Sequence, residues 1–327
     1  MRRLALALLL AIPASAQVLM PTARGIAVAH DGRLELFDDA GRAIWSAQGV
    51  GHATAMAASA ERVAVIDALA NEIVIAELSS GRVTRSATAE TPIDVCFAGG
   101  EVYVLARDAA VVQRVGGASV NVGRDPAFLR ESHGRSYVYA RGDGTLEEIE
   151  NGRVVRRVRV APFASDLELD QRTAYLVYPR EGRIRTVALD TLEVGSVDVG
   201  AVPSDLALAG GGTALTARVL AVADPAAKRV WITEGTQSMT QAVARGFLRG
   251  FLGLGLFGNR SSQFPTGVDR VVARGAQWVA YDSSSGALYR VTRQKSTLIA
   301  KDVAPAAFGI SADGIVWWDG SRVHRIR

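Results

Sequence analysis

Short apolar runs with a period of two recur along almost the whole chain, separated by turns rich in Gly, Asp or Asn. In the segment 52–91 the runs cover residues 55–58, 62–66, 72–76 and 82–87. The segment 164–202 repeats the arrangement, with runs at 167–169, 174–177, 183–188 and 193–199. Alternation of apolar and polar positions over four to eight residues is typical of half-buried strands. The pattern therefore predicts an all-β protein built from repeated groups of four short strands.

A short corner sequence marks the start of each group. Its seven copies begin at residues 52, 92, 126, 164, 203, 265 and 305, and five of them begin with Pro. Proline suits the entry to a strand because it has a fixed φ and no N–H to offer to the ladder. The steps between copies are 40, 34, 38, 39, 62 and 40 residues. A period near 40 made only of short strands predicts a β-propeller with four-stranded antiparallel blades.

The number of blades follows from the same boundaries. The repeat units run over residues 17–51, 52–91, 92–125, 126–163, 164–202, 203–264, 265–304 and 305–327, which favours eight blades over seven. The last unit has room for only three strands. We expect the N-terminal segment to supply the fourth strand and so to close the ring, because closure removes an exposed edge. A merger of the first and last units would reduce the count to seven.

The turns between second and third strands carry a recurrent pattern, an Asp followed four residues later by Asn or Gly and then by alternating apolar residues. It occurs at residues 67–74 and 282–288. In this respect the chain resembles the YVTN and NHL kind of propeller repeat of secreted bacterial proteins. The resemblance extends over most of residues 17–327 and implies a propeller fold without defining an activity.

The N-terminus has the features of a secretory signal peptide. Arg2 and Arg3 precede a short apolar run at 4–12, and the small residues 14–16 provide a cleavage site before Gln17. The apolar run is about half the roughly 20 residues that a spanning helix needs. We therefore predict a signal peptide at 1–16, a single propeller domain at 17–327 with no transmembrane helix after cleavage, and a periplasmic or secreted location.

Charge and cysteine content narrow the functional classes. The formal net charge is +4, and Lys occurs only at positions 228, 295 and 301, so nearly all basic residues are Arg. The densest basic cluster, at 153–159, alternates with Val as a strand does, and no aromatic residues are interleaved with it. We therefore predict no nucleic-acid partner. Cys96 is the only cysteine, which excludes an internal disulfide. Its position in an inner strand favours a buried thiol over a reactive one.

Three corners carry an Asp at the same offset, Asp94, Asp166 and Asp205. Equivalent positions of inner strands converge on the propeller axis, so these carboxylates are candidate ligands of Ca²⁺ or candidate general bases. His52, which replaces a corner Pro, is a further candidate. The alternative is that each Asp accepts backbone N–H bonds within its own corner. No zinc, phosphate-loop or serine-hydrolase motif accompanies these residues, and no cofactor is predicted apart from the calcium alternative.

The step of 62 residues marks an insertion in the sixth unit, about 238–262. Residues 242–258 place apolar side chains three to four residues apart, which predicts a partly helical segment despite five Gly. We expect an apolar surface of this size to be buried against another surface. Either the segment folds over its own propeller as a lid, or it docks on a protein partner or a membrane surface. The docking candidates are Arg245, Phe247, Leu248, Arg249, Phe251, Leu252, Leu254, Leu256 and Phe257.

Three functional hypotheses follow, of which the last is a structural ring with no ligand in its channel. The first is an exported propeller that acts as a non-enzymatic binding scaffold, with the insertion contributing to partner recognition. The second is a metal-assisted hydrolase or lyase of the lactonase type that uses Asp94, Asp166 and Asp205. Calcium content separates the scaffold from the enzyme, because only the enzyme requires a bound cation.

Overall fold

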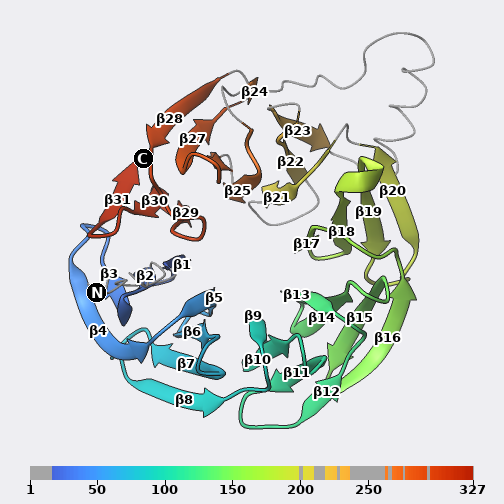
Figure 1. Ribbon diagram of the computed structural model, residues 1–327, viewed down its shortest axis with the longest axis horizontal. Coiled ribbons are helices and arrows are strands. Elements are labelled where there is room, and N and C mark those ends of the chain that lie inside the picture. Colours follow the sequence, from blue (N-terminus) through green and yellow to red (C-terminus); the bar gives the residue numbers. More distant parts are fainter. Residues whose placement is uncertain are drawn as a thin grey trace, which may run out of the picture.

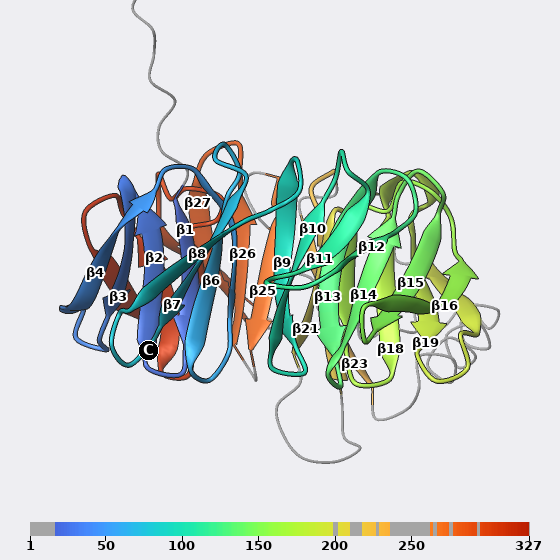
Figure 2. The same cartoon turned by 90° about the horizontal axis from the view of Figure 1, so that it is seen from below.

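The strands form eight antiparallel sheets, which are arranged as the blades of a ring (Figure 1). This computed structural model describes residues 17–198, 202–209, 218–226, 229–235, 262–263, 267–274, 277–292 and 295–326. Within these residues seven sheets have four strands and one has three. Figure 2 shows the ring from its side, with the strands running between its two faces. The observed count agrees with the eight blades that the corner spacing favours.

Blades 1 to 4 each begin with the strand nearest the axis and proceed outward (Figure 1). Blade 1 contains β1 (Val18–Thr22), β2 (Gly25–His30), β3 (Gly32–Phe37) and β4 (Ala43–Val50). Blade 2 contains β5 (Ala53–Ala58), β6 (Arg62–Asp67), β7 (Glu72–Glu77) and β8 (Val83–Ala87). Blade 3 contains β9 (Pro92–Ala98), β10 (Glu101–Ala106), β11 (Val111–Arg114) and β12 (Ser119–Asn121). Blade 4 contains β13 (Pro126–Ser132), β14 (Arg135–Ala140), β15 (Thr145–Glu150) and β16 (Arg153–Arg159).

Blades 5 to 8 follow the same order. Blade 5 contains β17 (Asp166–Leu169), β18 (Thr173–Tyr178), β19 (Arg183–Ala188) and β20 (Val194–Asp198), with the 3-10 turn η1 (Pro179–Glu181) between β18 and β19. Blade 6 contains β21 (Asp205–Ala209), β22 (Arg218–Asp224), β23 (Arg229–Gly235) and β24 (Ser262–Gln263). Blade 7 contains β25 (Arg270–Arg274), β26 (Gln277–Asp282), β27 (Ala287–Val291) and β28 (Ser296–Ala300). Blade 8 contains β29 (Phe308–Ser311), β30 (Gly314–Trp318) and β31 (Val323–Ile326).

Burial explains why some strands read as continuous apolar runs and others as alternating ones. The second strand of a blade packs against both neighbouring blades, so the last five residues of β6 and of β14 are all buried. The outer strand β16 alternates exposed and partly buried residues along its whole length. Its arginines therefore belong to a strand, as the sequence predicts. The core consists of apolar layers between successive blades, which is the expected packing of stacked sheets.

The closure of the ring differs from the prediction. The N-terminal strand β1 is the innermost strand of blade 1, where it pairs with β2, and blade 8 has only three strands among the described residues. The expectation that the N-terminus completes the last blade is therefore wrong. The β1–β2 hairpin is the more local pairing, and local pairings cost less chain entropy than distant ones. The first and last blades meet instead through a bond from Leu19 N to Ala306 O of 2.8 Å.

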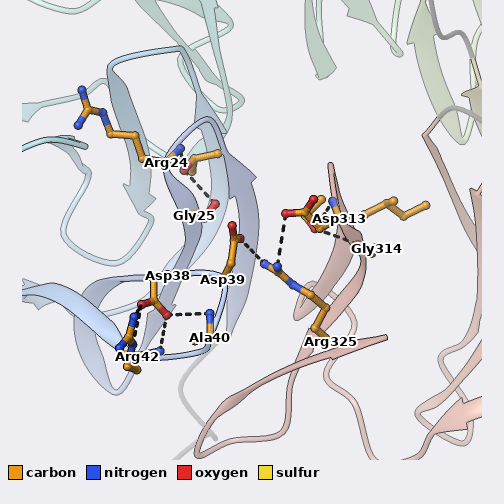
Figure 3. Close-up of polar contacts among 12 residues, drawn as sticks. Arg24, Gly25, Asp38, Asp39, Ala40, Arg42, Asp313, Gly314 and Arg325 are labelled. Carbon is orange, nitrogen blue, oxygen red and sulfur yellow. Dashed lines mark hydrogen bonds and ion pairs between the residues drawn. The ribbon is translucent and has the colours of Figure 1, made fainter. Parts of the chain in front are cut away.

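Polar side chains strengthen the contact between blades 8 and 1 (Figure 3). The Arg325 guanidinium on β31 lies between Asp39, 2.6 Å away, and Asp313, 3.5 Å away. Nearby, Asp38 Oδ1 accepts bonds from the backbone N–H groups of Ala40 and Arg42, which fixes the turn that presents Asp39. The ring is thus closed by main-chain pairing near the axis and by an ion pair farther out.

The abundance of Arg has a structural explanation, because guanidinium groups join one blade to the next. An Arg side chain is long and carries several donors, so it reaches carbonyl oxygens of a neighbouring sheet. These contacts are Arg62 to Gly100 O (2.5 Å), Arg85 to Gly49 O (2.5 Å), Arg156 to Leu189 O (2.6 Å), Arg270 to Pro305 O (2.6 Å) and Arg274 to Ile310 O (3.2 Å). These five arginines therefore join neighbouring blades.

The predicted insertion falls between the third and fourth strands of blade 6. The strand β24 pairs with the start of β23, with Gln263 opposite Arg229 and Ser262 opposite Val230. Residues 236–261 connect these two strands and lie outside the described residues, and so do the predicted helix at 242–258 and its docking side chains. The predicted signal peptide at 1–16 also lies outside them. No helix in the described part of the chain has the length and hydropathy needed to cross a bilayer.

Candidate functional site

The three corner carboxylates lie at or near the start of inner strands, at the same register position. Asp94 lies opposite Leu105, Asp166 opposite Val177 and Asp205 opposite Ala223, in each case one residue before the end of the second strand. The equivalent residue in blade 4 is Phe128, opposite Tyr139. The propeller repeat therefore places all three Asp side chains at one level of the ring, close to its axis.

Each of these carboxylates is bonded to the backbone of the next blade. One carboxylate oxygen accepts an N–H from the following inner strand, through the contacts Leu129 N to Asp94 (2.9 Å), Leu206 N to Asp166 (3.1 Å) and Val271 N to Asp205 (2.7 Å). The other oxygen of Asp94 and of Asp166 accepts the N–H of the residue that follows it. The predicted bond within the corner is thus present at two of the three corners. A second bond, which the sequence did not indicate, holds adjacent blades together.

Asp166 and Asp205 also contact each other. Their side chains are hydrogen-bonded, which requires one of the two carboxyl groups to carry a proton. Burial raises the pKa of Asp166, and burial together with the charge of Asp166 raises the pKa of Asp205 well above its usual range. The structure therefore brings two of the three predicted residues into one proton-sharing pair.

Arg130 connects the third predicted residue, Asp94, to this pair. Its Nη1 lies 2.7 Å from Asp94 Oδ2, and its Nε donates to Leu167 O at 2.9 Å. Arg130 sits on β13, between the strands that carry Asp94 and Asp166, so it joins three consecutive blades. Its side chain is only 29% exposed, which makes its bonds stronger than those of a surface arginine.

Glu168 completes what we call the axial cluster, which consists of Asp94, Arg130, Asp166, Glu168 and Asp205. Burial raises the pKa of Glu168 to about 7; the charge of Arg130 acts in the opposite direction, and the charges of Asp166 and Asp94 add to the increase. Glu168 is partly buried, and no hydrogen bond of its carboxylate occurs among the described residues. It is the group of the cluster best suited to exchange a proton at neutral pH.

Sequence reasoning missed Arg130 and Glu168, although the repeat contained a signal for both. Arg130 lies opposite Tyr137 and Glu168 lies opposite Tyr175, so the two residues occupy equivalent positions of successive blades. Each stands two residues after a corner position that had already been aligned, and side chains two apart on a strand share a face. Extending the alignment by two residues would have placed the positive charge of Arg130 beside the corner carboxylates. It would also have placed Glu168 at the equivalent position of the next blade.

His52 does not join the axial cluster. Its contacts in the structure are made by its backbone, with its N–H 3.3 Å from Asp67 Oδ1 and its carbonyl accepting from Ala68 N at 3.1 Å. No hydrogen bond or ion pair among the described residues connects its ring to Asp94, Asp166 or Asp205. Within the same residues, no group of three or more His, Cys, Asp or Glu side chains has an arrangement suited to a metal ion.

Comparison with known proteins defines the class by its fold. BamB from Moraxella catarrhalis matches with a TM-score of 0.63 and 10% identity over 94% of each chain. The dihydro-heme d1 dehydrogenase NirN, in complex with DHE, matches with a TM-score of 0.62 and 10% identity over 96% of this chain and 73% of that one. A streptogramin B lyase matches with a TM-score of 0.60 and 10% identity over 83% and 91%.

The chain is thus a β-propeller repeat protein. Identities of 10% establish the shared fold alone, and the similar structures include enzymes as well as BamB. No protein-family model matches the sequence. No curated protein matches it either.

Proposed function

We propose that this protein is an exported β-propeller that acts as a non-enzymatic binding scaffold. The observation that carries the proposal is the set of hydrogen bonds that the corner carboxylates accept. Asp94, Asp166 and Asp205 all accept backbone N–H groups of the next blade, so their chief role is to hold inner strands together. A ring fixed in this way is a rigid frame on which loops are presented to a partner. The signal-like residues 1–16 and the resemblance to YVTN and NHL repeats of secreted proteins support a periplasmic or secreted location.

The proposed partner site is the insertion at about 238–262. Its apolar side chains, together with Arg245 and Arg249, suit a protein partner or a membrane surface. Its position between two paired strands of one blade supports the proposal, because β23 and β24 anchor both ends of the segment to the ring. A partner could then be bound without any change in the propeller.

This proposal is tested by cross-linking capture from an envelope extract. We expect the intact protein to capture a specific partner that a variant with Phe247→Ser and Phe251→Ser loses, because two large anchors are removed from the segment. A matched control carries Ile44→Ser and Leu298→Ser, which change two exposed apolar residues of the outer strands, 49% and 44% exposed. Capture that is equal for all three forms would contradict the docking role of the insertion.

A second candidate function is a hydrolase or lyase of the lactonase type. The proton-sharing pair Asp166–Asp205 and the neutral-range pKa of Glu168 favour it, since acid–base catalysis needs groups of this kind. The metal-assisted form requires the axial carboxylates to bind a cation such as Ca²⁺. The N–H groups that already occupy Asp94, Asp166 and Asp205 compete with such a cation.

Metal analysis separates the two functions. After equilibration with calcium and gel filtration, we expect far less than one Ca²⁺ per chain, because both oxygens of Asp166 accept backbone N–H groups. The measurement is elemental analysis of the native protein and of an Asp166→Ala variant. One tightly bound Ca²⁺ per chain that disappears in the variant would favour the enzyme over the scaffold.

A further inference from the structure

A polar pocket lies between blades 3 and 4, away from the corner carboxylates. Its volume is about 440 Å³, which is within the range of small-molecule sites. The turns β9–β10, β13–β14 and β15–β16 surround it, so it opens on the face of the ring opposite the blade-to-blade corners. The lining residues that matter for its chemistry are Glu101, Tyr103, Arg114, Arg135 and Glu150.

Tyr103 places a hydroxyl in this pocket without a partner. The residue is 9% exposed, and no hydrogen bond of its hydroxyl occurs among the described residues. Burial raises its pKa, and the nearby charges of Arg114 and Glu101 have opposite effects on it. The hydroxyl oxygen itself reaches solvent through the pocket, so a bound ligand can contact it.

The neighbouring blades show how unusual this hydroxyl is. The equivalent tyrosine of blade 5, Tyr175, donates to Asp170 at 2.7 Å. In blade 4 the equivalent Tyr137 is hydrogen-bonded to Arg135. Three blades thus carry a tyrosine at the same register position, and in two of them the hydroxyl is bonded within the protein. In blade 3 the partner is missing at the place where the pocket lies.

The charged groups of the pocket come in both signs. Arg114 lies directly across the sheet from Tyr103, and no carboxylate pairs with it in the described structure. Glu101 precedes Tyr103 by two residues on the same face of β10 and also has no ion pair there. Arg135 is already held by Glu148 at 2.7 Å and Glu150 at 3.6 Å. One cation and one anion therefore remain available beside the free hydroxyl.

We propose that this pocket binds a small zwitterion of the size of an amino acid or a dipeptide. Arg114 and the Tyr103 hydroxyl receive the carboxylate, since a guanidinium and an O–H are both donors that match its oxygens. Glu101 receives the ammonium group. The mixed charge of the lining disfavours a ligand of a single sign, because such a ligand would leave one of the two charges facing a like charge. This site is independent of the insertion in blade 6.

The test uses the intact propeller and L-alanyl-L-alanine as the probe, with binding followed by ligand-observed NMR up to about 10 mM ligand. We expect saturable binding that Arg114→Gln weakens roughly tenfold or more. The C-terminally amidated and N-acetylated dipeptides should bind the native protein comparably weakly. In the Arg114→Gln variant, amidation of the dipeptide should reduce the binding affinity little further, because the guanidinium that receives the carboxylate is already absent. Arg24→Gln, which removes another exposed arginine, in blade 1, serves as the control and should leave binding unchanged.

The Tyr103→Phe variant distinguishes a role of the hydroxyl in ligand binding from a role in stability. Because its hydroxyl has no partner in the free protein, this variant should weaken the binding of the dipeptide while its Tm stays unchanged or rises. Tyr175→Phe should do the opposite, with a lower Tm and unchanged binding, since it loses the bond to Asp170. The proposal is overturned by a native protein that binds neither the dipeptide nor any free amino acid. It is also overturned by binding that survives both Arg114→Gln and Tyr103→Phe, or by an N-acetylated dipeptide that binds as well as the free one.

Discussion

Replacing Arg130 by Met is expected to lower the free energy of unfolding by about 2–4 kcal/mol. The guanidinium holds Asp94 and the carbonyl of Leu167, so its loss leaves a mostly buried carboxylate without its cation and a carbonyl without its donor. The measurement is equilibrium unfolding in urea at pH 7. Arg24→Met, which removes an exposed arginine from blade 1, should change the free energy by less than about 0.5 kcal/mol.

A double variant tests the stated cause. Asp94→Asn removes the charge that Arg130 neutralises, so Arg130→Met should cost less in the Asp94→Asn background than in the native protein. Equal costs in both backgrounds would show that the ion pair contributes nothing and that Arg130 acts only through Leu167 O. The destabilisation should also be larger at pH 8 than at pH 5, because Arg130 opposes the rise in the pKa of Glu168 and Asp166.

Stability is expected to fall as the pH rises from about 4.5 to about 7, by about 2–3 kcal/mol from Glu168 alone. The unfolded chain releases the proton of Glu168 near pH 4.5, whereas the folded protein keeps it until about pH 7. The folded state therefore binds more protons in this window, and each increase in pH favours unfolding. The raised pKa values of Asp166 and Asp205 act in the same direction, starting from their ordinary value of 3.8.

Variants assign this pH dependence to the axial cluster. Glu168→Gln should flatten the stability profile between pH 4.5 and 7, and Asp205→Asn should raise stability at pH 8 by about 1–2 kcal/mol. The Asn amide keeps an acceptor for Val271 N and offers an N–H to Asp166. Glu193→Gln, a change of the same kind at an exposed position of blade 5, should leave the profile as it is. A native profile that is flat or rises over this window would contradict the assignment.

Other carboxylates set the acid limit of stability. A bond from Arg141 lowers the pKa of Asp125, and bonds from the Arg124 backbone and side chain lower that of Asp143. Their stabilising effect is present above the ordinary Asp pKa and is lost as the pH falls through their lowered values. The protein should therefore be most stable in mildly acidic solution, between the two titration regions.

Much of the fold could be predicted because a propeller repeats its local chemistry. The corner sequences and the apolar runs place the strands of blade 2 within one or two residues of β5 to β8. The sequence predicts that Cys96 is a buried thiol, and it is 7% exposed with a pKa raised to about 12 by burial. The closure of the ring was not predicted correctly, because the pairing of β1 with β2 depends on competition between two arrangements that both satisfy the strand pattern.

For the site, the sequence predicted only the residues that recur at the same position of several repeats. Asp94, Asp166 and Asp205 were found because they share a corner position. Arg130 and Glu168 were missed because they differ in charge although they share a register position. The pocket beside Tyr103 left no pattern in the sequence, since Arg114 and Glu101 look like ordinary surface charges until the strands are paired.

The amino-acid sequence by itself determined the strand repeat, the corners and the propeller architecture, because turn residues and alternating apolar positions act locally and recur about every 40 residues. Tertiary structure decided which charges meet. The Asp166–Asp205 pair and the Asp94–Arg130 pair arise from contacts between residues distant in the chain, and so does the pocket that the Tyr103 hydroxyl faces. Such contacts depend on the distances and burial that packing creates, and those are set only when the blades close into a ring.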